Sequence, residues 1–254
     1  MKTVLLIGIG AGNRDYVTIQ AVKALNEVDV FFFLDKGQEK EDLANLRRTI
    51  CERFIEDKSY RIVEVPGPVR DANAPDYKAG VEAWHRDKAK IFSSLIANEL
   101  ADGETGAFLV WGDPSLYDST VRVIEHILAE GTLRFEYRII PGITSVQALA
   151  AEHKIALNPI GEPVHITTGR RLMEGHPDSV DTAVVMLDNG TGLRAWTGQN
   201  AEIFWAAYLG TPDQILISGK LDECVAAIEE ARGEARNRKG WIMDTYLLRR
   251  TPRQ

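Results

Sequence analysis

The sequence predicts an α/β protein with two α/β domains and a ligand cleft between them. Three stretches carry this prediction, because each is a short apolar run that ends in a glycine-containing turn and leads into a helical pattern. The runs end at Ile9, Trp111 and Ile140. Ligands of open α/β sheets bind beyond the carboxyl ends of the strands, so these three turns are the expected binding loops.

Length and composition are those of a globular protein. The chain has 254 residues, 44% of them hydrophobic, which is enough for one large domain or two modest ones. Its net charge of −7 argues against a nucleic-acid coat or an anchor on an anionic membrane. The two cysteines, Cys51 and Cys224, are too few for a disulfide scaffold or a metal cluster, so we expect a cytoplasmic protein without a metal. The first residues read as a strand rather than a signal peptide, and no apolar run is long enough to span a membrane.

Strands and helices alternate along the first hundred residues. Apolar runs rich in β-branched residues predict strands, and apolar residues spaced three and four apart predict helices. The expected strands span 3–9, 28–34 and 61–65, and the expected helices span 17–25 and 41–54. A polar loop that contains Trp84 and His85 then leads into a helix that ends near Leu100. Such a loop is either a functional lid or a surface insertion.

The glycines after the first strand match part of a dinucleotide-binding fingerprint. That fingerprint needs Gly, Gly and Gly or Ala at relative positions 1, 3 and 6, with an acid after the second strand. Gly8, Gly10 and Asp35 fit, but the sixth position is Asn13. The spacing therefore disfavours a dinucleotide site in this loop.

The middle of the chain repeats the order of strand, turn and helix. A strand over 107–111 ends at Gly112-Asp113-Pro114, and a strand over 136–140 precedes a helix over 146–151. A domain boundary is expected near Ala156, which gives domains 1–156 and 157–254. The second domain is expected to contain strands over 164–168, 183–187, 214–218 and 241–248, and helices near 200–209 and 221–231.

Polar residues at two of these turns have two interpretations each. Asp113 follows a buried strand, where it either closes the turn and caps the next helix or holds a ligand. Thr144 and Ser145 stand where a helix begins, so they are either an ordinary N-cap or hydroxyls that face a polar ligand. The residues alone leave both interpretations open.

Three motifs, taken in order and spacing, resemble the tetrapyrrole methylase family. They are Leu-Ile-Gly-Ile-Gly-Ala-Gly at 6–12, Trp-Gly-Asp-Pro-Ser-Leu-Tyr at 111–117 and Ile-Pro-Gly-Ile-Thr-Ser at 140–145, and 211–214 and 221–223 also fit. Residues 35–37, 42–43, 46–48 and 186–190 resemble one branch of the family, the deacetylating methyltransferases of cobalamin biosynthesis. At 12–15, Gly-Asn-Arg-Asp replaces the family's usual Gly-Asp-Pro-like turn.

The resemblance implies a bilobal enzyme, usually a homodimer, that holds S-adenosylmethionine in its cleft. A sulfonium cofactor needs acceptors, backbone groups and an apolar slot together, and the carboxylate of Asp113 can supply an acceptor. The positions that match the family's cofactor contacts are Gly112, Asp113, Leu116, Thr144, Ser145, Leu187, Ala207, Leu209, Ile242 and Met243.

The branch resemblance implies methylation of C-1 of precorrin-5 together with loss of its acetyl group as acetate, with water as co-substrate. Methyl transfer is a displacement that needs alignment more than a strong acid or base. Acetate loss also needs a group that positions water and stabilises charge on the acetyl oxygen. The candidates are Asp15 with its neighbour Arg14, Asp35 and Tyr117, although each also reads as a surface, turn or core residue.

A substrate with many carboxylates needs basic side chains around it. Those available in the first domain are Arg14, Lys36, Arg47, Arg48, Arg70 and Arg86, and ordinary helix surface charge is the alternative. Two other functions fit the same fold. One is methylation of ribosomal RNA or of a modified histidine in a translation factor, which the lack of a basic stretch disfavours. The other is a non-catalytic tetrapyrrole carrier, for which the Gly-Asp-Pro and Thr-Ser motifs would not be needed.

Overall fold

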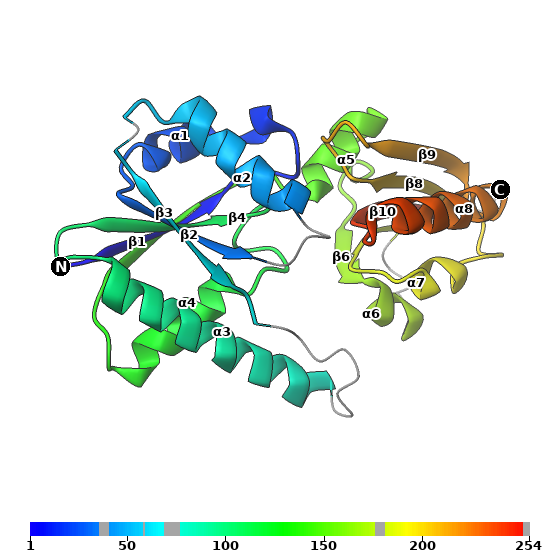
Figure 1. Ribbon diagram of the computed structural model, residues 1–254. Helices are drawn as coiled ribbons and strands as arrows, with labels where there is room; N and C mark the ends of the chain where they lie inside the picture. The colour runs from blue at the N-terminus through cyan, green and yellow to red at the C-terminus, as the bar shows by residue number, and fades with distance from the viewer. Residues whose placement is uncertain (36–40, 58, 69–76, 176–180, 251–254) are drawn as a thin grey trace. The chain divides into compact units, whose positions relative to one another are not determined.

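The structure is a computed structural model that describes residues 1–35, 41–57, 59–68, 77–175 and 181–250. The chain forms two compact units, of which the first is Met1–Gly10 with Arg14–Ile143 and the second is Ala11–Asn13 with Thr144–Gln254. Each unit contains one five-stranded sheet with helices packed on it (Figure 1). The predicted fold class, two α/β domains, is confirmed.

The sheet of the first unit is parallel throughout, in the order β3-β2-β4-β1-β5. Its strands are β1 (Thr3–Gly8), β2 (Val30–Asp35), β3 (Arg61–Pro66), β4 (Thr105–Val110) and β5 (Glu136–Ile140). The helices are α1 (Ile19–Leu25), α2 (Glu41–Phe54), α3 (Tyr77–Glu99) and α4 (Thr120–Glu130), with a short 3-10 turn, η1 (Arg14–Tyr16). Most of these elements lie within two or three residues of the predicted ranges. An exception is α3, which begins early enough to include Trp84 and His85, so these two residues are helical rather than part of a loop.

The strand order places a topological switch point at the carboxyl ends of β1 and β4. The chain runs from β1 to β3 in one direction along the sheet and from β3 to β5 in the other, so right-handed crossovers place α1 and α2 on one face and α3 and α4 on the other. Both central strands are buried on both faces, which explains their almost wholly apolar sequences. The connections that follow these two neighbouring strands leave in opposite directions, and that is the arrangement in which ligands bind.

The sheet of the second unit is mixed, in the order β6-β7-β10-β8-β9. Only β6 and β7 pair in parallel, and the other neighbours are antiparallel. The strands are β6 (Val164–Thr168), β7 (Thr182–Met186), β8 (Ala201–Ala207), β9 (Ile215–Lys220) and β10 (Asp244–Arg250). The helices are α5 (Ser145–His153), α6 (Gly169–Met173), α7 (Thr191–Arg194) and α8 (Leu221–Lys239).

One predicted element is wrong, because the helix expected near 200–209 is the strand β8. Ile203 and Trp205, two residues apart, both face the core of the second unit, so the apolar period is that of a strand. The short helices α6 and α7 were not predicted. The two units divide after Ile143 rather than near Ala156, since α5 packs on β8 and β10 and so belongs with the second unit.

Candidate functional site

Two glycine-containing loops meet at the carboxyl ends of β1 and β4 in the first unit. Gly10 and Gly112 form an isolated bridge, in which Gly112 N donates to Gly10 O at 2.8 Å and Gly10 N donates to Gly112 O at 3.3 Å. Both glycines have left-handed backbones, with φ of 79° and 69°, a conformation that residues with a β-carbon rarely adopt. The bridge therefore fixes the loop after β1 to the loop after β4.

A third loop, after β5, packs against the same place through close backbone contact. A β-carbon on Gly142 would lie 2.1 Å from Gly112 O, and a β-carbon on Gly8 would lie 2.6 Å from Gly142 N. Neither Gly8 nor Gly142 has a positive φ, so it is the space and not the backbone angle that requires glycine here. The motifs after β1, β4 and β5 are thus brought together, as their positions in the sequence predicted.

Asp113 ties the last two of these loops together. Its Oδ1 accepts from Ser115 N at 2.7 Å and from Ser115 Oγ, and its Oδ2 accepts from Gly142 N at 2.8 Å. Burial by itself would raise the pKa of the Asp113 carboxyl, but these hydrogen bonds outweigh burial and hold the pKa below its ordinary value. The carboxylate therefore closes its turn, and one lone pair on Oδ2 is left over from the three bonds.

The rest of the Gly-Asp-Pro loop is also ordered by hydrogen bonds. Leu116 N donates to Asp113 O, and Thr120 N donates to the carboxylate of Asp118 at 2.6 Å. Between them Tyr117 has a left-handed backbone with φ 52° and a side chain that is 44% exposed. Burial raises the pKa of the Tyr117 hydroxyl, so this group is protonated and can donate at neutral pH.

Two basic side chains approach this loop from the helices, and no local sequence pattern predicts that either is desolvated. Lys88 of α3 is buried, with Nζ 2.9 Å from Ser119 Oγ and 5.4 Å from the centre of the Trp84 ring. Arg47 of α2 donates from Nε to Leu109 O at 3.2 Å. Burial lowers the pKa of both groups, and the carboxylate of Asp118 opposes that effect. Their charges stabilise the end of β4 and the start of α4.

The other predicted catalytic residues lie on the first unit's surface. Asp15, in η1, forms an exposed ion pair with Arg53 at 2.7 Å. Asp35 is exposed at the end of β2, where its carbonyl accepts from Gly67 N at 2.8 Å. Since β4 lies between β1 and β2, Asp35 and the loop after β1 follow strands that are not neighbours.

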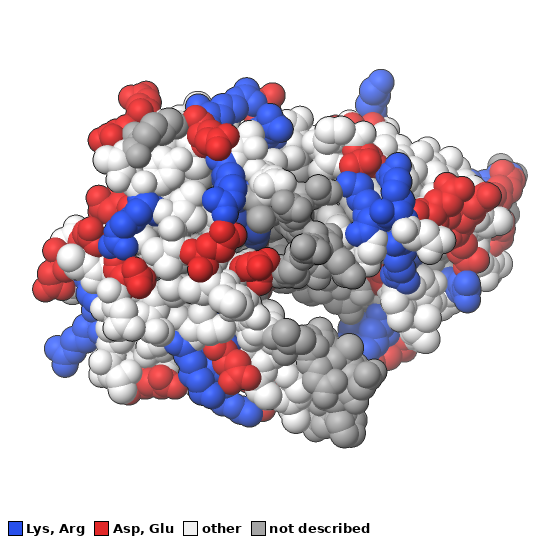
Figure 2. All heavy atoms as spheres, viewed as in Figure 1, with Lys and Arg blue, Asp and Glu red and all other residues white. Residues whose placement is uncertain are grey.

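The basic side chains predicted to gather around a substrate differ in their partners and in their exposure. Arg48 pairs with Glu64, Arg14 and Arg86 are exposed, and Arg47 is partly buried. Lys36 and Arg70 lie outside the described residues. On the face drawn in Figure 2, acidic and basic side chains are interspersed over the described part of the first unit, in keeping with the net charge of −7.

In the second unit, several predicted cofactor positions lie at the same end of the sheet, where β7 and β8 finish and β10 begins. β10 runs antiparallel to β7 and β8, so its first residue lies beside the last residues of those strands. Leu187 follows β7, Leu209 follows β8, and Ile242 and Met243 precede β10. Tyr208 N donates to Met243 O at 2.9 Å, which joins the residue after β8 to the residue before β10.

Only some of these residues offer a side chain to a ligand. Ala207 is fully buried in the core and Leu209 is 5% exposed, whereas Leu187 is 68% exposed. Residues 11–13 of the loop after β1 pack in this unit, where a β-carbon on Gly12 would lie 2.2 Å from Leu209 O. The backbone of Leu209 is therefore in close contact with that loop.

Thr144 is the N-cap of α5, as one of the two interpretations held. Its Oγ1 accepts from Val146 N at 3.1 Å, and the side chain of Gln147 returns to the Thr144 backbone, which completes a capping box. Ser145 is the first residue of the helix. The cap satisfies the end of the helix from within the chain, and it does not by itself indicate a ligand.

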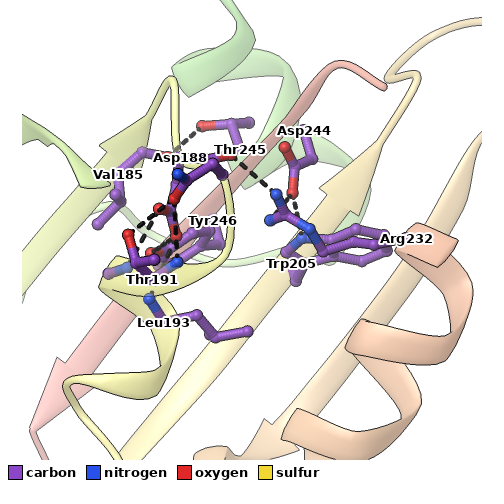
Figure 3. A network of polar contacts seen from close by, with 11 residues as sticks. Val185, Asp188, Thr191, Leu193, Trp205, Arg232, Asp244, Thr245 and Tyr246 are labelled. Carbon is purple, nitrogen blue, oxygen red and sulfur yellow. Dashed lines mark hydrogen bonds and ion pairs between the residues drawn. The ribbon is translucent and has the colours of Figure 1, made fainter. Parts of the chain in front are cut away.

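A buried polar cluster lies near the same end of the second sheet, where β7 finishes and β10 begins (Figure 3). We call Asp188, Trp205, Arg232, Asp244 and Tyr246 the Asp188 network. The Arg232 guanidinium pairs with Asp244 Oδ2 at 2.6 Å, Trp205 Nε1 donates to the same oxygen at 2.9 Å, and Tyr246 Oη donates to Asp188 Oδ2 at 2.8 Å. Burial raises the pKa of Asp244 and of Tyr246, while the Arg232 guanidinium opposes both shifts. Sequence reasoning missed the cluster, because its bonds join residues up to 58 positions apart in the sequence.

The described residues contain neither a metal site nor a membrane-spanning helix. In residues 1–35, 41–57, 59–68, 77–175 and 181–250, no three His, Cys, Asp or Glu side chains are placed to hold a metal ion. No helix of the described chain is long and apolar enough to cross a membrane.

Fold and loops together define a class of protein. The family model of the tetrapyrrole (corrin/porphyrin) methylases matches residues 3–225, and the chain belongs to this family. The resemblance predicted from the three glycine motifs is confirmed, and so is the enzyme class, a methyltransferase.

Particular relatives narrow the comparison. The chain is 50% identical over 250 residues to precorrin-6A synthase [deacetylating] of a Sinorhizobium species, a match that covers 98% of this chain and 96% of that one. A solved structure from Corynebacterium diphtheriae, described as related to cobalamin synthesis (CobF), is 39% identical with a TM-score of 0.84, and the match covers 99% of this chain and 100% of that chain. Uroporphyrin-III C-methyltransferase of Thermus thermophilus, solved with S-adenosyl homocysteine, is 19% identical with a TM-score of 0.56 over 97% and 96% of the two chains. At that identity the likeness shows the fold alone.

Proposed function

We propose that this chain methylates C-1 of precorrin-5 with S-adenosylmethionine and removes the acetyl group of the substrate, giving precorrin-6A, acetate and S-adenosylhomocysteine in aerobic cobalamin biosynthesis. The proposal rests mainly on one observation. The chain is 50% identical to a precorrin-6A synthase of the deacetylating type, and the match covers nearly the whole of both chains. The loops described above support it, because they place a carboxylate and an exposed leucine at the carboxyl ends of strands.

S-adenosylmethionine supplies an electrophilic methyl group on a sulfonium. The proposed contacts in the first unit are Gly112, Asp113 and Leu116. Asp113 is ionised at neutral pH and has one lone pair on Oδ2 beyond its three hydrogen bonds, so it can accept from an ammonium group or balance a positive charge. Those of the second unit are Thr144, Ser145, Leu187, Ala207, Leu209, Ile242 and Met243. Because Ala207 and Leu209 are buried, we assign their contribution to the backbone.

Acetate loss requires a donor to the acetyl oxygen and a group that orients water. We assign the donor to Tyr117, since its hydroxyl is protonated at neutral pH and its left-handed backbone presents an exposed side chain beside the Gly-Asp-Pro turn. Asp35 and Asp15 are the candidate carboxylates for orienting the water. Asp15 also forms an exposed ion pair with Arg53.

The assembly and location proposed with this function are a homodimer in the cytoplasm. The family resemblance supports the dimer, and the presence of only two cysteines supports a reducing compartment. Sedimentation equilibrium of the purified chain distinguishes a dimer from a monomer.

Replacing Asp113 tests the cofactor assignment. We expect Asp113→Ala to weaken binding of S-adenosylhomocysteine by about 100-fold, because the substitution removes a charged acceptor and releases Gly142 N from its bond. Isothermal titration calorimetry measures this change. The matched control is Asp57→Ala, since Asp57 closes a similar turn by accepting from Ser59 N at 2.9 Å but precedes β3 at the opposite end of the sheet. Equal affinity for Asp113→Ala and the wild type would remove Asp113 from the cofactor site.

A further inference from the structure

Leu187 has a conformation that stability alone does not explain. Its φ of 54° lies in the left-handed region, which is strained for a residue with a β-carbon, and its side chain is 68% exposed. A glycine at this position would remove both the strain and the exposed apolar surface. The retention of strain at a strand end is typical of residues that contact a ligand.

The residues on either side of Leu187 are held in place. Before it, Met186 pairs with Thr245 in the ladder between β7 and β10, and Thr245 Oγ1 donates to Val185 O at 3.0 Å. After it, Asp188 O accepts from Arg232 Nη2 at 2.8 Å. Since the residues before and after Leu187 are both held by hydrogen bonds, the chain must turn at Leu187 itself, through that residue's own φ and ψ angles.

The carboxylate of Asp188 is enclosed as well. Oδ1 accepts from Gly192 N at 3.1 Å, and Oδ2 accepts from Leu193 N at 3.2 Å and from the Tyr246 hydroxyl (Figure 3). A β-carbon on Gly169 would lie 2.1 Å from Oδ1, so the start of α6 presses directly on this carboxylate. Hydrogen bonds and packing leave Asp188 with one position.

Stability alone does not explain why the Asp188 network contains charged residues. Asp188 and Arg232 are 8% and 7% exposed within an apolar core, and a buried ion pair often contributes no more to stability than apolar residues of the same size. What the network does fix is the backbone and side chain of Asp188, next to the strained leucine.

We propose that the Asp188 network is a positioning device that holds Leu187 in its left-handed turn, so that the leucine side chain covers the adenosyl group of the methyl donor. The inference rests on the proposed function, and it adds residues that never touch the cofactor. The faces of the adenine ring are flat and pack well on apolar groups, and an exposed leucine gives one face an apolar surface to pack on. Asp188 and Tyr246 act through Leu187 and are positioning residues.

Three single variants test the proposal, each measured for the Kd of S-adenosylhomocysteine and for the thermal unfolding midpoint. Leu187→Gly relieves the strain and removes the cover, so we expect an unchanged or higher midpoint together with about tenfold weaker binding. Tyr246→Phe removes only the hydroxyl donor to Asp188, and we expect about fivefold weaker binding. Ile228→Val, in α8 of the same core, lowers stability without removing any hydrogen bond of the network, and we expect it to bind like the wild type.

The outcomes separate the inference from the proposed function. If the wild type binds S-adenosylhomocysteine and Leu187→Gly binds equally well, the inference is overturned and the proposed function stands. Wild-type affinity in Tyr246→Phe, or the same loss of affinity in Ile228→Val as in Tyr246→Phe, also overturns it, since affinity then does not depend on the network. No binding by the wild type would overturn both.

Discussion

Gly142→Ala is expected to destabilise the protein by about 3 kcal/mol and to abolish measurable binding of S-adenosylhomocysteine. A β-carbon on Gly142 would lie 2.1 Å from Gly112 O and 2.9 Å from Gly8 Cα, and both are backbone atoms that no side-chain rotation can move. Forcing atoms into such a contact costs about 1–3 kcal/mol or more. The shift also breaks the bond from Gly142 N to Asp113, so the binding loops separate.

The control for this substitution is Gly233→Ala. Gly233 lies in α8 with an exposed position and no atom within 4 Å of the added β-carbon, so alanine there should raise stability by about 1 kcal/mol. Urea unfolding measures both changes. If Gly142→Ala unfolds at the wild-type urea concentration, the three loops are not packed through their glycines as described.

Arg232→Met is the second large effect, with an expected loss of about 3–5 kcal/mol, because it leaves the Asp244 carboxylate buried without its cation. The side chains of this pair are 8% and 5% exposed, and Trp205 Nε1 also donates to Asp244 Oδ2. Burial already raises the pKa of Asp244, so removal of the guanidinium raises it further. We expect the thermal midpoint to fall by about 10 °C.

Arg194→Met is the matched control, since Arg194 pairs with Glu229 of α8 at an exposed position, where an ion pair contributes about 0–1 kcal/mol. The double variant Arg232→Met with Asp244→Asn should recover part of the loss, because it removes the uncompensated charge. An Arg232→Met protein as stable as Arg194→Met would mean that Asp244 is not desolvated.

The parts of the fold that could be predicted are those set by local pattern. The helix over 41–54 and the strand over 136–140 have the predicted bounds, because their apolar periods are clear. The three glycine turns were found because glycine is needed there both for left-handed backbones and for close contact. Strand β8 was mistaken for a helix, since its period of two became evident only when Ile203 and Trp205 were seen on one face.

What could not be predicted depends on contacts between distant residues. Arg232 and Asp188 are 44 positions apart, and nothing local to either announces a buried bond between them. The left-handed backbones of Leu187 and Tyr208 are imposed by the strands around them and not by their own preferences. Lys88 reads in sequence as helix surface charge, and it is desolvated because α3 packs against the start of α4.

Asp113 shows how far a sequence pattern can predict the chemical role of a residue. The sequence left open whether Asp113 closes a turn or holds a ligand, and the structure shows that it closes the turn. Its ligand role stays a prediction, as do those of the other cofactor positions, because each is inferred from likeness to a family.

The most direct test is mass spectrometry of precorrin-5 incubated with the purified protein and S-adenosylmethionine. We predict a product that has gained one methyl group and lost its acetyl group, with acetate and S-adenosylhomocysteine formed in equal amounts. Protein that binds S-adenosylhomocysteine but leaves precorrin-5 unchanged would contradict the proposed substrate, and other precorrins would then be the next acceptors to try.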